Sequence, residues 1–116
     1  MTERLLLDTH TFLWAVREPA KLSQHAADLI ADRGNDVLVP AMVAWELAIK
    51  YRSGKLPEAG PVVADYASVL VRLGASSLPN THTHMLNAGL MDWAHRDPFD
   101  RLLAAIAINE GLPLVS

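Results

Sequence analysis

Four short apolar segments alternate with longer helical patterns along this chain, and that alternation limits the fold more than any other feature. Residues 4–8 and 36–40 are too short for stable helices, are apolar or β-branched, and end at a polar residue or proline. Residues 75–78 and 113–116 are weaker candidates of the same kind. Strands that alternate with helices predict an α/β fold with a central parallel sheet and helices on both faces. We expect one domain over residues 1–116.

The segments between these strands have helical patterns with recognisable ends. We expect a helix from Ser23, as N-cap, to a stop at Gly34, and another from Pro98 to a stop at Gly111. Residues 57–61 contain two prolines and a glycine and are predicted to form a loop, and residues 81–90 are a short helix or an irregular turn. The remaining predicted helices are 9–17, 41–52 and 62–73.

Composition excludes several functional classes. The 116 residues contain no cysteine, which rules out disulfides, thiolate metal sites and cysteine nucleophiles. No run of about 18 apolar residues is present, so a transmembrane helix is not expected, and the N-terminus lacks the apolar length of a signal peptide. A cytoplasmic protein is therefore expected. The net charge of −3 neither indicates nor excludes a nucleic-acid partner, because a local basic patch or a bound cation can reverse the field.

Two carboxylates stand three residues apart where the last predicted helix begins. Asp97 precedes Pro98 and is predicted to be the N-cap, and Asp100 falls in the first turn on the same side of the helix. Acids at a helix N-terminus satisfy free N–H groups and suit the helix dipole, so capping alone explains both. A functional role depends on whether other acids reach the same place.

Asp8 and Glu46 are the acids that the predicted fold brings toward this helix. Asp8 ends the first strand, and ligands of parallel sheets bind beyond the carboxyl ends of the strands. Glu46 has mostly apolar neighbours at helical spacing, so it lies on or beside a buried stripe, although an exposed-edge pair with Lys50 is the alternative. Clustered carboxylates need a counter-charge, and Mg²⁺ or Mn²⁺ prefers oxygen ligands and activates water for attack on a phosphodiester. The residues thus suggest a metal-dependent phosphodiesterase.

Other reactive or aromatic residues give weaker signals. The five histidines form no metal-binding pair at helical spacing, and His82 and His84 are predicted to be solvated. The tryptophans, Trp14, Trp45 and Trp93, are predicted to be core or interface residues in preference to base-stacking platforms. An aspartyl-phosphate enzyme is disfavoured, because His10 stands where its second acid is needed.

Four blocks of the sequence closely resemble PIN-domain proteins, and within them the VapC-type toxins of type II toxin–antitoxin systems. The blocks are residues 6–14, 45–50, 95–103 and 111–116, in family order. The resemblance implies a three-layer PIN-like fold and a Mg²⁺- or Mn²⁺-dependent endoribonuclease that is masked by a cognate antitoxin protein and is generally a homodimer. It assigns metal binding and catalysis to Asp8, Glu46 and Asp100. The supporting positions are Thr9, Asp97 and Ser116.

The sequence departs from the family pattern at one place. The pattern has a fourth acid just beyond the position of Ser116, and the given sequence does not contain it. We therefore expect that the domain lacks its C-terminal end and that its metal binding is weaker than in a complete relative. The alternative function is a catalytically inactive PIN-like module for binding or assembly. For RNA binding, the weak candidates are Lys50, Arg96 and Arg101.

Overall fold

The computed structural model describes residues 3–92 and 97–115. The first half contains β1 (Arg4–Leu7), α1 (Thr9–Arg17), the 3₁₀ turn η1 (Pro19–Lys21), α2 (Gln24–Ala31), β2 (Asp36–Pro40) and α3 (Ala41–Arg52). The second half contains the 3₁₀ turn η2 (Pro57–Ala59), α4 (Gly60–Ala64), α5 (Tyr66–Leu73), β3 (Ala75–Leu78), α6 (His82–Leu90), α7 (Pro98–Glu110) and β4 (Leu114–Val115). All four predicted strands are present.

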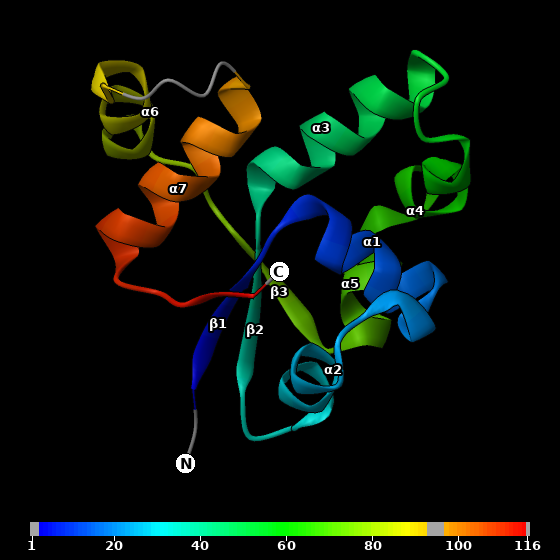
Figure 1. Ribbon diagram of the computed structural model, residues 1–116. Coiled ribbons are helices and arrows are strands. Elements are labelled where there is room, and N and C mark those ends of the chain that lie inside the picture. The colour runs from blue at the N-terminus through cyan, green and yellow to red at the C-terminus, as the bar shows by residue number, and fades with distance from the viewer. Residues whose placement is uncertain (1–2, 93–96, 116) are drawn as a thin grey trace.

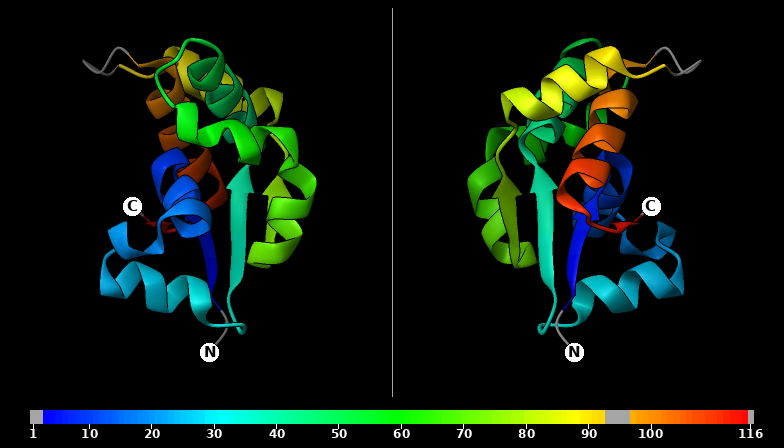
Figure 2. Two further views of the ribbon diagram at one scale, coloured as in Figure 1. Left: turned by 90° about the vertical axis from the view of Figure 1, so that its right-hand side faces the viewer. Right: turned by 90° about the vertical axis from the view of Figure 1, so that its left-hand side faces the viewer.

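The strands form one parallel sheet in the order β3-β2-β1-β4. Leu5 stands opposite Val37, and Leu6 stands opposite Leu114, so β1 lies between β2 and β4. Figure 2 shows the strands rising from the N-terminal end toward α3 and α6. Because all strands run the same way, their carboxyl ends meet at one edge of the sheet, as the sequence predicted.

Helices cover both faces of this sheet, which confirms the predicted three-layer α/β fold. Alternate residues of a strand point to opposite faces. Leu5 and Leu7 therefore pack into a core with α1, α2, α4 and α5, whereas Leu6 packs into a second core with α6 and α7. Figure 1 shows these two groups of helices on opposite sides of the strands, with α3 above them. Helix α3 contributes Met42 to the second core and Leu47 to the first.

Three segments differ from the sequence prediction. The single helix expected over residues 62–73 is divided at Asp65, whose φ of −138° is outside the helical range. The expected loop at 57–61 instead forms η2 and the first turn of α4, where Pro61 is tolerated because first-turn N–H groups have no helical partner. Helix α2 ends at Ala31, before the predicted stop at Gly34.

The prediction of a solvated His84 is wrong, because its side chain is only 1% exposed. Thr81 is the N-cap of α6, and its Oγ1 accepts from the His84 backbone N–H at 3.2 Å. In return, the His84 Nδ1 accepts from the Thr81 backbone N–H at 3.1 Å. This reciprocal capping box explains why a histidine is buried at the start of a helix. His82 is exposed, as predicted.

Within residues 3–92 and 97–115, no helix combines the length and the apolar character needed to span a membrane.

Tyr66 carries a buried hydroxyl that has no hydrogen-bond partner among the described residues, and burial raises the pKa of Tyr66 to about 12. We expect Tyr66→Phe to raise the free energy of unfolding by about 1 kcal/mol at neutral pH, since the hydroxyl is desolvated without compensation. Above its ordinary pKa of 10.0 the tyrosine ionises more readily in the unfolded chain, so the wild type loses stability between pH 10.0 and about 12. Tyr66→Phe should not show this loss of stability between pH 10.0 and about 12.

Urea unfolding of both proteins at neutral and alkaline pH measures this difference. Tyr51→Phe is the matched control, because Tyr51 is exposed. A Tyr66→Phe variant that is less stable than the wild type at neutral pH would contradict the expectation.

Candidate active site

Asp8 stands directly after β1 and caps the helix that follows. Its backbone is extended, with φ −78° and ψ 172°, and its Oδ1 accepts from the Thr11 N–H at 2.7 Å. The side chain is half-buried and lies at the carboxyl end of a central strand. Asp8 can therefore cap α1 and line a site in the same geometry, at the ligand-binding edge of the sheet where the sequence predicted it.

Glu46 is buried in α3, with 4% exposure. Its Oε1 accepts from the Thr9 hydroxyl at 2.5 Å, and its Oε2 pairs with the Lys50 Nζ at 2.5 Å. The Lys50 side chain is 24% exposed, so the pair is not the exposed-edge pair that the sequence offered as an alternative. Both carboxylate oxygens are thus held, which compensates a buried charge that is otherwise costly.

Asp97 and Asp100 begin α7 as the sequence predicted. Asp97 is the N-cap, and its Oδ1 accepts from the Phe99 N–H at 2.9 Å. Pro98 occupies the first helical position and Asp100 the first turn. The N-terminus of a helix of 13 residues carries the positive end of its dipole, which stabilises acids placed here.

These acids line one pocket, with a volume of about 460 Å³, that we call the acidic pocket. Its polar lining consists of Asp8, Thr9, His10, Glu46, Lys50, Asp97 and Asp100. Leu103, Ala104 and Leu114 complete it, so α1, α3, α7 and β4 all contribute. The expected convergence of acids that are distant in sequence is therefore present in the structure.

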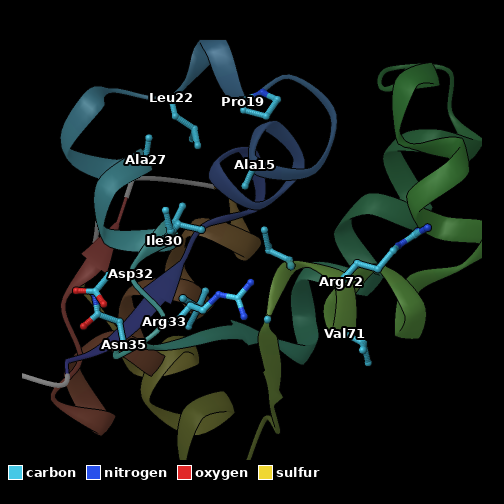
Figure 3. A pocket seen from close by; sticks show the side chains of 14 residues that line it. Ala15, Pro19, Leu22, Ala27, Ile30, Asp32, Arg33, Asn35, Val71 and Arg72 are labelled. Carbon is cyan, nitrogen blue, oxygen red and sulfur yellow. The ribbon is translucent and has the colours of Figure 1, made fainter.

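A second, larger pocket of about 710 Å³ lies elsewhere and contains none of the predicted site residues. Figure 3 shows it between η1, α2 and α5, with Leu22, Ile30 and Val71 among its lining residues. Asn35, which precedes β2, and Gly74, which precedes β3, also line it. It is thus at the amino ends of these strands, whereas ligands of parallel sheets bind at the carboxyl ends.

The donor chemistry of the acidic pocket suits a hard divalent cation. Four carboxylates face one ammonium group, and repulsion between carboxylates favours additional positive charge. Within residues 3–92 and 97–115, no group of three or more histidine or acidic side chains is arranged to enclose a metal ion. Mg²⁺ does not require such a cage, since it often binds one or two carboxylates and keeps several waters. The residues therefore fit Mg²⁺ or Mn²⁺.

Arg101, a candidate for RNA binding, makes contacts that the sequence did not reveal. Its Nη2 donates to the carbonyls of Ala88, Gly89 and Met91 at 2.8, 3.3 and 3.1 Å. These carbonyls lie at the end of α6, where the helix leaves such groups unpaired. Arg101 therefore ties α6 to α7, and its contact with RNA stays a prediction. Arg96 and Ser116 lie outside the described residues.

Two further residues near the acids were not selected from the sequence. His10 lines the acidic pocket and is exposed, and its place two residues after Asp8 was the only available signal. Trp45, predicted to be a core or interface residue, is 61% exposed, so it is not part of the core. The sequence does not distinguish Trp45 from a buried tryptophan, because the side of α3 that is covered depends on how distant segments pack against it.

Comparisons with known proteins give a consistent family. The family model described as "PIN domain" matches residues 5–116. Ribonuclease VapC16 of Mycobacterium tuberculosis is 39% identical over 56 residues, which are 48% of this chain and 40% of that protein. The chain thus aligns with less than half the length of this curated relative.

A solved structure shares the fold. The crystal structure of VapC20 of Mycobacterium tuberculosis, described as a toxin that cleaves the sarcin-ricin loop, superposes with a TM-score of 0.55 at 20% identity. The superposition covers 93% of this chain and 84% of VapC20.

Proposed function

The chain belongs to the PIN-domain family, and from this premise we propose that it is a Mg²⁺- or Mn²⁺-dependent endoribonuclease that acts as the toxin of a type II toxin–antitoxin pair. The observation that carries the proposal is the gathering of Asp8, Glu46, Asp97 and Asp100 in one pocket at the carboxyl end of β1. The names of two similar proteins, a ribonuclease and an RNA-cleaving toxin, support the choice of substrate.

Asp8, Glu46 and Asp100 are the residues that would hold the metal. When bound, the cation activates a water molecule for attack on a phosphodiester and neutralises the charge that develops. Asp97 has a different task, because its contact with the Phe99 N–H fixes the start of α7. Asp97 thereby sets the position of Asp100, which follows in the first turn.

Thr9 and Lys50 position Glu46 from opposite sides. The Thr9 hydroxyl holds Oε1, and the Lys50 ammonium holds Oε2. Both groups lie in the acidic pocket, so the Lys50 ammonium is also within the space that an RNA phosphate enters. The N-terminus of α7 adds favourable potential for an anion at the same place.

The partners of this activity follow from the same proposal. RNA is the substrate, a cognate antitoxin masks the pocket, two copies of the chain form a homodimer, and the protein acts in the cytoplasm. Arg96 and Arg101 are the remaining candidates for contact with the RNA backbone.

Incubation of the purified chain with labelled single-stranded RNA tests the proposed function. We expect cleavage with Mg²⁺ or Mn²⁺, no cleavage after chelation by EDTA, and recovery when the metal is returned in excess. Single-stranded DNA of the same sequence is the control for substrate class. Intact RNA under all metal conditions, together with no Mn²⁺ binding by calorimetry, would favour the catalytically inactive PIN-like binding module instead.

A further inference from the structure

An aromatic pair, the exposed Trp45 and the partly buried Phe99, stands beside the acidic pocket. The Trp45 ring meets the Phe99 ring with centroids 5.1 Å apart and planes at 75°, an edge-on contact between α3 and α7. Trp45 precedes Glu46 and Phe99 precedes Asp100, so each aromatic residue is the chain neighbour of an acid in the pocket. Trp45 remains 61% exposed although it has this partner. Trp45 is therefore in contact with Phe99 and is still available to a ligand.

A small cavity of about 220 Å³, here called the aromatic pocket, adjoins this pair. Trp45, Met85, Pro98 and Phe99 supply apolar walls, and Arg101 lines it as well. The Arg101 guanidinium is anchored through Nη2 to backbone carbonyls, while its Nε–H has no hydrogen-bond acceptor among the described residues. Because the Arg101 Nε is itself buried, the pocket combines apolar walls with an anchored guanidinium, and its volume is smaller than the roughly 300–1,000 Å³ of most drug-sized ligand sites.

We propose that the aromatic pocket seats one base of single-stranded RNA, stacked on Trp45, next to the phosphate held in the acidic pocket. The inference rests on the proposed function, because it needs RNA in the acidic pocket. Recognition of single-stranded RNA commonly places unstacked bases on aromatic side chains and hydrogen-bonds their edges. Helices α3 and α7 line both pockets, so one nucleotide and its neighbouring phosphate can occupy the two sites together.

A binding experiment separates stacking from phosphate contact. All variants carry Asp8→Asn, which keeps the RNA intact during the measurement. Fluorescence anisotropy with Mg²⁺ present measures the affinity for a random-sequence single-stranded RNA pool and for an abasic oligomer of the same length and charge. We expect Trp45→Ala to weaken RNA binding about tenfold, because it removes the ring on which the base stacks, and to leave binding of the abasic oligomer unchanged. Trp45→Phe should retain most of the affinity.

The salt dependence adds a readout that a merely structural effect would not reproduce. Trp45→Ala should leave the slope of log affinity against log salt unchanged, because stacking releases no counterions, whereas Lys50→Met should reduce the slope by about one phosphate contact. Tyr51→Ala, which removes an exposed aromatic ring from the same helix and from neither pocket, is the matched control. Urea unfolding verifies that each variant is folded.

The possible failures are distinguishable. The base site is overturned if Trp45→Ala weakens binding of RNA and of the abasic oligomer equally, or weakens binding of neither. In that case RNA cleavage by the wild type still supports the proposed function. Absence of both RNA cleavage and RNA binding in the wild type overturns both. If Trp45→Ala binds RNA like the wild type but no longer binds a co-expressed partner protein, the aromatic pocket is a site for that protein. This result also overturns the base site.

Discussion

Asp8→Asn and Asp100→Asn should each lower the rate of RNA cleavage by about a thousandfold. Metal catalysis contributes several kcal/mol of stabilisation to the developing charge, and each 1.4 kcal/mol is a factor of ten in rate. An amide is neutral and is a poorer ligand for a hard cation than a carboxylate. Single-turnover cleavage of labelled RNA with Mg²⁺ or Mn²⁺ measures the effect, and calorimetry with Mn²⁺ alone measures the accompanying loss of metal affinity.

The fold should survive both changes. Asparagine is as good an N-cap as aspartate, so Asp8→Asn can keep the hydrogen bond that Oδ1 accepts from the Thr11 N–H. Asp100→Asn weakens a favourable interaction with the helix dipole, which contributes about 0.3–1 kcal/mol. Asp65→Asn is the matched control, because Asp65 lies between α4 and α5 and outside the acidic pocket. Full cleavage by both Asp8→Asn and Asp100→Asn would refute their assignment to the site.

Lys50→Met should lower the free energy of unfolding by about 2–3 kcal/mol in the absence of divalent ions. Removing one partner of a buried ion pair typically costs about 3–5 kcal/mol, because the other charge stays buried and unpaired. The loss should be somewhat smaller here, since the Lys50 side chain is 24% exposed and water can reach it. Urea unfolding in EDTA measures the change.

A second substitution tests the cause of this loss. Adding Glu46→Gln to Lys50→Met removes the unpaired charge, so the double variant should recover most of the stability. Together with the Glu46→Gln single variant, these two variants give a coupling energy for the pair. If the proposed metal site is correct, saturating Mn²⁺ should stabilise Lys50→Met more than the wild type. Equal stability of Lys50→Met and wild type in EDTA would show that the pair contributes little.

The elements that position the site were predictable because their signals are local. A short apolar run before Asp8 identifies a buried strand, and the Asp97-Pro98 step identifies a helix start. The rule that ligands bind at the carboxyl ends of parallel strands then predicts from the sequence that Asp8 lies near Asp97 and Asp100. The acidic pocket contains all three.

The features that were missed depend on how distant segments pack. His84 is buried because α7 packs beside α6. Arg101 makes its contacts because the carbonyls at the end of α6 lie next to its position in α7. The exposure of Trp45 depends on how α3 crosses α7, which no local pattern records. The break at Asp65 between α4 and α5 is a local feature of the chain. The sequence did not predict it, because apolar residues continue at helical spacing on both sides of Asp65.

The pairing of β4 with β1 has a consequence for synthesis. Leu114 stands opposite Leu6 and lines the acidic pocket, so the pocket is complete only when a strand made late joins a strand made first. Domains emerge from the ribosome N-terminal end first, and contacts between distant segments form slowly. A nascent chain therefore contains Asp8 and Glu46 well before it can assemble the acidic pocket.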